Sequence, residues 1–237
     1  MIRVTVWNEN VHEREHQGVR DIYPDGIHGC IAKFLELDEE IVAKTATLEM
    51  PSHGLTDEVL ENTDVLIWWA HCHHHEVSDE IAKKVQQAVL KGMGLIVLHS
   101  GHLCKPFTLL MGTSCTLKWR DNDRERVWCC NPGHPIAKAI PEQFEIPVEE
   151  MYGEFFDIPN PDEVVFLGWF KGGEVFRSGV TFTRGRGRIF YFQPGHEWNP
   201  TYHIEPVQKI ITNAVKWAAP TCRIDEIGCP NTQPLEK

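Results

Sequence analysis

The sequence lacks the features that mark membrane, nucleic-acid-binding and disulfide-rich proteins. Its apolar runs are strand-length, well short of the ~20 residues that a membrane-spanning helix needs. It has 23 Lys and Arg against 34 Asp and Glu, and this net charge of -11 disfavours nucleic acids and anionic membranes as partners. None of the eight cysteines forms a CxxC pair, so the strongest sequence signal of a structural zinc site is missing.

The N-terminal run is not expected to act as a signal peptide. Residues 1–7 have no long apolar core of the signal-peptide kind and are typical of a first strand. We therefore expect a cytoplasmic protein whose cysteines are reduced and form no disulfide. A small molecule is the expected partner, and a homo-oligomer stays open.

Strand and helix patterns alternate over the first hundred residues. Continuous apolar strands are typical of a parallel sheet that is buried on both faces. The sequence thus predicts an α/β fold: a doubly wound, mostly parallel sheet with helices on both faces. The strands that end near Trp7, Ala70 and Leu98 should be parallel neighbours. The predicted strands of this half are 2–7, 41–48, 64–70 and 94–98.

The second half follows a different pattern. Residues 118–175 lack long helical periodicity, which indicates inserted strands and loops. The run 184–188 predicts a hairpin turn, and a last helix should begin near Glu205. We expect one domain over residues 1–218, followed by a C-terminal extension over 219–237.

Histidine is the residue type in excess, with 13 copies. Open α/β sheets bind ligands beyond the carboxyl ends of their strands, and four predicted strand ends are followed by histidine. This coincidence predicts a functional pocket at that edge of the sheet. The histidines in question are His12, His71, His73, His99 and His196.

Two of these histidines, His71 and His73, form a candidate metal-binding pair. If the strand continues, residues i and i+2 point to the same face, and two imidazoles there can share an ion. The alternative is a polar loop in which only one or two histidines function. We expect His71, His73, Glu154 and His196 to bind a divalent metal, with zinc as the expected ion.

Three residues are candidates for catalysis: His99, Ser100 and Glu154. His99 and Ser100 lie at a predicted strand-to-helix turn, where Ser100 could act as a nucleophile with His196 as its base, although the GxSxG motif is absent. His99 could itself act as a general base. Glu154 lies among aromatic residues that would raise its pKa, or it is a surface residue beside a core phenylalanine.

Polar and aromatic residues near the strand ends are candidates for binding a sugar. The aromatic members suit the apolar face of a sugar ring, and they fit a hydrophobic core equally well. The expected substrate-binding residues are Asn8, Asn10, His12, Trp69 and Trp198.

Four runs of the sequence resemble the ThuA-like, or trehalose-utilisation, family over residues 1–218. That family is similar in fold to the class I glutamine amidotransferases, with a flavodoxin-like topology. The resemblance implies a role in the utilisation of trehalose or a related disaccharide or sugar derivative. The four runs are 69–74, 94–100, 133–136 and 185–191.

The same resemblance argues against glutamine hydrolysis. The amidotransferases have a cysteine at the elbow after a central strand, and a His and a Glu separated by one residue after a late strand. Here the elbow has His99 and Ser100, and His196 and Glu197 are adjacent. Three hypotheses remain: a metal-assisted or His/Glu acid–base enzyme, a serine hydrolase, and a non-catalytic sugar-binding accessory protein. The convergence of histidines favours the first.

Overall fold

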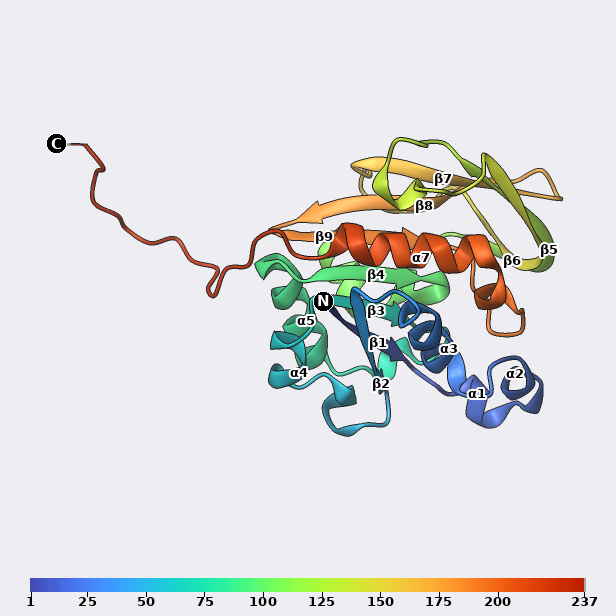
Figure 1. Ribbon diagram of the computed structural model, residues 1–237, viewed down its shortest axis with the longest axis horizontal. Helices are drawn as coiled ribbons and strands as arrows, with labels where there is room; N and C mark the ends of the chain where they lie inside the picture. The colour runs from blue at the N-terminus through green and yellow to red at the C-terminus, as the bar shows by residue number, and fades with distance from the viewer. Residues whose placement is uncertain (237) are drawn as a thin grey trace.

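A nine-stranded mixed sheet organises residues 1–236, which are the residues that the computed structural model describes (Figure 1). The strand order is β2-β1-β3-β4-β9-β8-β7-β5-β6. The strands are β1 (Ile2–Asn8), β2 (Ile41–Thr47), β3 (Val65–Trp69), β4 (Gly94–Leu98), β5 (Lys118–Cys129), β6 (Gln143–Gly153), β7 (Glu163–Phe170), β8 (Val175–Arg184) and β9 (Gly187–Phe192).

The first five strands in this order are parallel and follow the flavodoxin-like order, with β9 as the fifth strand. The predicted neighbours β1, β3 and β4 pair in parallel, as expected. Every residue of β3 and β4 is buried, because helices cover both faces of the sheet. The alternation of apolar strands and helices therefore predicted this half of the fold correctly.

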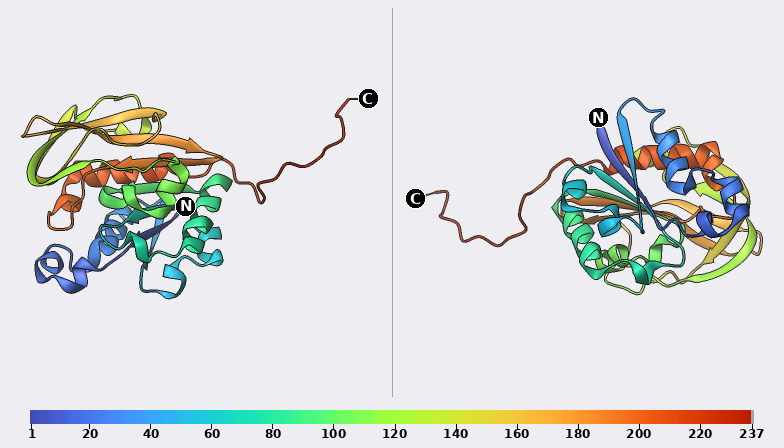
Figure 2. Two further views of the ribbon diagram at one scale, coloured as in Figure 1. Left: turned by 180° about the vertical axis from the view of Figure 1, so that it is seen from behind. Right: turned by 90° about the horizontal axis from the view of Figure 1, so that it is seen from below.

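Helices form a layer on each face of the parallel strands (Figure 2). The apolar sides of α3 and α7 pack into one core cluster, and α5 and α6 pack into the other together with the strand faces opposite. Ser78 caps the N-terminus of α5, since its hydroxyl accepts a hydrogen bond from the backbone N–H of Ile81. The helices are α1 (His12–Glu15), α2 (Gln17–Ile22), α3 (Gly26–Leu35), α4 (Asp57–Glu61), α5 (Asp79–Lys91), α6 (Lys105–Met111) and α7 (Glu205–Ala218).

The remaining strands continue the same sheet in antiparallel order from β9 outward. The predicted hairpin joins β8 to β9 through Gly185 and Arg186. Gly185 has a φ of +60°, and a Cβ there would lie 2.4 Å from the carbonyl oxygen of Leu90, so the turn fits against the end of α5 only with glycine. The inserted strands thus extend the sheet, and they build a wall of the site described below.

The last described residues leave the domain as an extended chain (Figure 1). Its first part is held by the backbone N–H of Ile224, which donates to the carbonyl oxygen of Lys91. Among residues 1–236, no helix is both long enough and apolar enough to span a membrane. All eight cysteines are unpaired within this part of the chain.

Candidate functional site

Four strand ends lie in a row at one edge of the sheet. In the parallel register, Asn8 of β1 pairs with Trp69 of β3, Trp69 with Leu98 of β4, and Leu98 with Phe192 of β9. Each strand is followed by a segment that contains histidine. The register therefore brings together side chains that are up to about two hundred residues apart in the sequence.

A cavity of about 470 Å³ opens at this edge. Its size lies within the range typical of small-molecule sites. Its inner wall comes from the ends of the parallel strands, and its outer wall comes from β5, β6 and the segment before β5. The lining residues are His71, Cys72, Ser100, His102, Leu103, Thr116, Leu117, Trp119, Asp121, Glu150, Tyr152 and His196.

The carboxylate of Glu197, which is fully buried, pairs with two histidines beside this cavity. Its Oε1 lies 2.7 Å from Nδ1 of His12 and 2.9 Å from Nδ1 of His71. Burial works against ionisation, yet these hydrogen bonds hold the pKa of Glu197 well below its usual range. The second oxygen, Oε2, is buried and has no hydrogen-bond partner among the described residues.

Cys72 lies next to the same two histidines. Hydrogen bonds from His12 and His71 lower the pKa of its thiol to about 6. Hydrogen bonds to Cys72 and Glu197 in turn raise the pKa of His12 to about 10. Burial opposes a charged His71, but the same two partners raise its pKa to about 11. At neutral pH, this cluster therefore favours protonated imidazoles at His12 and His71 beside an ionised Cys72 thiol.

A second buried pair, His99 and Glu150, lies behind the cavity. His99 follows β4 with a φ of +51°, so it occupies the elbow of the strand-to-helix turn. Its Nδ1 donates to the carbonyl oxygen of Gln193 at 3.0 Å, and its Nε2 lies 3.0 Å from Oε2 of Glu150. Burial disfavours its charge, but pairing with Glu150 raises the pKa of His99 and thereby favours the protonated imidazole.

Hydroxyl groups connect this pair to the cavity. The hydroxyl oxygens of Ser100 and Tyr152 lie 2.8 Å apart, and the Tyr152 ring stacks on His99 at a centroid distance of 5.1 Å. The hydroxyl of Tyr152 also lies 3.5 Å from Nε2 of His99. The arrangement can pass a proton between His99 and a molecule in the cavity.

Four side chains at the strand ends could hold a metal ion. Donor atoms of His71, His99, His196 and Glu197 all lie within 4.8 Å of one another. A tetrahedral zinc site with bonds of ~2.1 Å places its ligand atoms roughly 3.4 Å apart, so small side-chain rotations would close the cluster on an ion. Because both nitrogens of His99 have partners, His71, His196 and Glu197 are the three available donors.

Two buried carboxylates hold the loops that bear these donors. Glu9 accepts hydrogen bonds from the backbone N–H groups of Cys72 and His73. Glu149 accepts from the backbone of His196 at 3.0 Å, from that of Gly195 at 2.8 Å and from the Thr201 hydroxyl at 2.7 Å. The strand ends are thus fixed by charge-assisted hydrogen bonds.

A family model described as trehalose utilisation matches residues 3–218 of the chain. The chain belongs to the ThuA family. No curated protein sequence matches it. The match covers the sheet from the second residue of β1 onward and all the site residues described above, so family membership applies to the domain that contains the cavity.

Solved structures share this fold at low sequence identity. A ThuA-like protein from Parabacteroides merdae superposes with a TM-score of 0.70 at 14% identity, over 95% of this chain and 92% of that one. A cytoplasmic protein from Salmonella typhimurium gives 0.61 at 12% identity, over 93% and 100%. PurLQS from Thermotoga maritima gives 0.52 at 14% identity, over 91% and 98%. The fold of this ThuA chain is thus ThuA-like and class I glutamine amidotransferase-like, as the sequence predicted.

Of the four expected metal ligands in this ThuA chain, His71 and His196 lie together at the cavity and the other two do not. The chain leaves the extended conformation after Trp69, so His73 does not share a face with His71; its Nδ1 instead lies 2.6 Å from the exposed Glu76. Glu154 follows the end of β6 and pairs with Arg177 at 2.7 Å. This pairing holds the pKa of Glu154 below its usual range although burial opposes it, in contrast to the expected rise.

The expected sugar-binding residues lie around the cavity without lining it. Asn8 is buried, and its amide donates to Glu13. Asn10 donates its backbone N–H to Asn8, and His12 binds Glu197. Trp69 is fully buried in the core, where its indole donates to the carbonyl oxygen of Gly195, and half-exposed Trp198 contacts His16. These contacts give Asn8 and Trp69 structural roles in positioning the strand ends.

Several site residues were missed by the reasoning from sequence. Glu197 directly follows His196, and its place at a strand end was the available signal. Glu149 and Glu150 form an acidic pair inside a strand, which is unusual enough to mark a buried site. Nothing in the local sequence indicated Trp119 or Asp121, because only the pairing of β5 with β6 brings them to the cavity.

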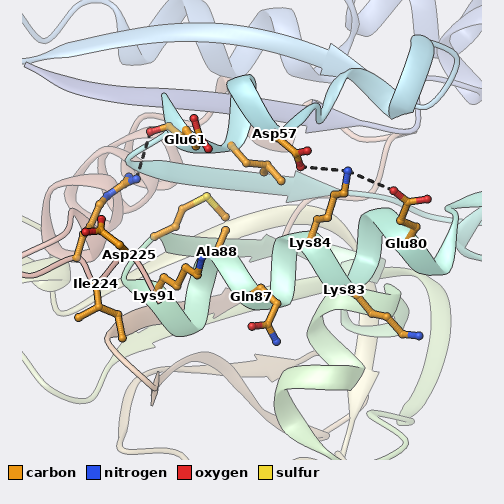
Figure 3. A pocket seen from close by; sticks show the side chains of 13 residues that line it. Asp57, Glu61, Glu80, Lys83, Lys84, Gln87, Ala88, Lys91, Ile224 and Asp225 are labelled. Carbon is orange, nitrogen blue, oxygen red and sulfur yellow. Dashed lines mark hydrogen bonds and ion pairs between the residues drawn. The ribbon is translucent and has the colours of Figure 1, made fainter. Parts of the chain in front are cut away.

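A larger cavity, of about 800 Å³, lies along α4, α5 and the start of the C-terminal extension (Figure 3). Its polar groups are surface ion pairs, such as Lys84 with Asp57 at 3.0 Å and with Glu80 at 3.2 Å. No histidine is among the described residues that line it. Solvated pairs of this kind are common on helix surfaces, so the smaller histidine-lined cavity is the candidate site.

Proposed function

We propose that this chain is a metal-assisted enzyme of carbohydrate utilisation, acting on trehalose or a related disaccharide or sugar derivative in the 470 Å³ cavity. One observation supports this most strongly. His71, His196 and Glu197 come from two different strand ends, and their donor atoms lie close together. Oε2 of Glu197 is buried and has no hydrogen-bond partner within residues 1–236. Membership of a family named for trehalose utilisation supports the substrate class.

Zinc is the ion that we propose for these donors. Two imidazoles and one carboxylate are a ligand set that catalytic zinc sites use, with the fourth position open. A zinc ion there would supply Lewis acidity, which polarises a sugar oxygen and makes water more acidic. The remaining chemistry belongs to the protein: His99, whose protonated form pairs with Glu150, can donate a proton through the Tyr152 hydroxyl.

The experiment is elemental analysis of the full chain, purified without chelator and then dialysed against zinc. We expect about one ion per chain in the wild type, and loss of the ion in His71→Ala and His196→Ala. His73→Ala and Glu154→Gln are matched controls, because both side chains are paired elsewhere, and they should retain the ion. Far-UV circular dichroism checks that each variant is folded.

Turnover is tested on the same samples by following trehalose, sucrose and related disaccharides with NMR. Loss of turnover on chelation and its return with zinc would support the enzyme. Equal metal content in all variants, or none in the wild type, would contradict the metal site. A metal-free protein that binds sugars without converting them would instead be an accessory protein. A cytoplasmic location is part of the proposal and agrees with the description of the Salmonella typhimurium neighbour.

A further inference from the structure

The outer wall of the cavity is one face of the β5–β6 ribbon. Trp119 lies directly opposite Tyr152 in the antiparallel register. Asp121 lies two residues beyond Trp119, where the β5–β6 register shifts between Arg120 and Asp123, and Glu150 lies two residues before Tyr152 on β6. All four side chains line the cavity. The antiparallel part of the sheet therefore supplies a wall of its own, facing the candidate metal ligands.

Trp119 is 63% exposed, more than Trp198 at 46% or Trp169 at 41%. Trp7, Trp68 and Trp69 are fully buried. An indole that stays exposed on the wall of a polar cavity presents a broad, flat apolar surface. The apolar C–H face of a pyranose ring matches such a surface in shape and hydration.

Asp121 supplies polar contacts two residues along the same strand. Its carboxylate is exposed and has no ion pair or side-chain hydrogen bond within residues 1–236. Oxygen atoms of Asp121 and Glu150 lie within 4.8 Å of a ring nitrogen of His196. Carboxylates accept hydrogen bonds and cannot donate when ionised, so this wall suits a ligand that is rich in hydroxyl donors.

The negative charge of the outer wall distinguishes uncharged sugars from sugar phosphates. No lysine or arginine is among the described residues that line it, whereas Asp121 and Glu150 are acidic. Arg120 lies between Trp119 and Asp121 in sequence, but its guanidinium is bound by Glu174 at 2.8 Å. A phosphate group at this outer wall would meet the like charge of Asp121 and Glu150, without the arginine or lysine contacts that phosphate sites normally use.

We propose that Trp119 and Asp121 form the recognition wall for an uncharged pyranose ring. Trp119 stacks on the ring, Asp121 accepts hydrogen bonds from its hydroxyls, and sugar phosphates are rejected. This inference rests on the proposed function, because it assigns recognition of the substrate to the same cavity.

The test is titration of the full chain with trehalose, sucrose and trehalose 6-phosphate. Binding is monitored by calorimetry and by tryptophan fluorescence. We expect a neutral disaccharide to bind, and Trp119→Ala to weaken it roughly tenfold or more, consistent with the loss of a stacked aromatic surface. Trp119→Phe should restore most of the affinity, and Asp121→Asn should weaken binding. Trehalose 6-phosphate should bind at least roughly tenfold more weakly than trehalose.

Trp169→Ala is the matched control, since Trp169 is 41% exposed and lies outside this cavity. Binding that Trp119→Ala leaves unchanged, equal or tighter binding of the 6-phosphate, or no binding of any neutral disaccharide would overturn the recognition wall. Metal content, measured on the same samples, reports separately on the proposed function. If metal-free protein binds trehalose through Trp119, the proposal of a metal-assisted enzyme is contradicted, whereas the proposed recognition by Trp119 and Asp121 still holds.

Discussion

Oε1 of Glu197 lies 2.9 Å from Nδ1 of His71, although 126 residues separate the two in the sequence. The contact exists because β4 alone separates β3 from β9 in the sheet, and both strands end at the same edge. A fully buried carboxylate that pairs with imidazoles in this way is costly to disturb, since removal of one partner leaves a buried group uncompensated.

Glu197→Gln should destabilise the protein by about 3 kcal/mol, because it removes the charge that His12 and His71 share. Urea unfolding at neutral pH measures the change. Glu76→Gln is the control: it removes an equivalent partner from His73 at an exposed position and should cost less than about 1 kcal/mol. Similar losses of unfolding free energy in the two variants would show that the buried pair stabilises the protein no more than the exposed pair does.

Glu149→Gln should loosen the loop that bears His196. The amide group would replace one of two oxygens that both accept hydrogen bonds, leaving buried donors without partners. We expect zinc affinity to fall roughly tenfold or more, as for other residues that orient metal ligands. Glu145→Gln, on the exposed part of the same strand, should leave affinity unchanged. Unchanged affinity in Glu149→Gln would contradict this positioning role.

His102 should make the protein less stable in mild acid. Burial lowers the pKa of His102 to about 3, and its Nδ1 donates to the carbonyl oxygen of Cys115 at 2.7 Å. The unfolded chain binds a proton at this histidine below about pH 6.5, whereas the folded protein does not until about pH 3. The folded state is therefore favoured fully above about pH 6.5 and loses about 1.4 kcal/mol per pH unit below it.

His102→Asn tests this linkage, because the asparagine amide can keep the hydrogen bond to Cys115 without titrating. Between roughly pH 6 and pH 4, its free energy of unfolding should fall less steeply than that of the wild type, by about 1.4 kcal/mol per pH unit. Urea unfolding at several pH values provides the measurement. Parallel curves for the two proteins would refute the assignment.

Thiol titration should find eight free cysteines in protein unfolded under non-reducing conditions, since all eight are unpaired in the described structure. The free thiols are counted by their reaction with a chromogenic disulfide reagent. A count of six would reveal a disulfide and contradict the expectation of reduced cysteines.

Local sequence patterns determined the parallel half of the fold. The apolar runs that became β3 and β4 are long enough only for strands, and helical periodicity between them leaves right-handed crossovers as the favoured connection. Parallel strands that all point the same way must end at one edge. For this reason the strand-end rule could place His71, His99 and His196 together before any coordinates existed.

Tertiary structure alone decided which neighbours these histidines have. His73 was expected beside His71, but the backbone turns after Trp69 and is held by the carboxylate of Glu9, a contact between two strand ends that no local pattern encodes. Likewise, Trp119 reaches the cavity only through the pairing of β5 with β6, whose register depends on packing over the whole sheet. The hydrophobic periodicity of a helix or strand identifies which of its faces is buried. The contacts between elements that are distant in sequence depend on the free energy of packing the whole core.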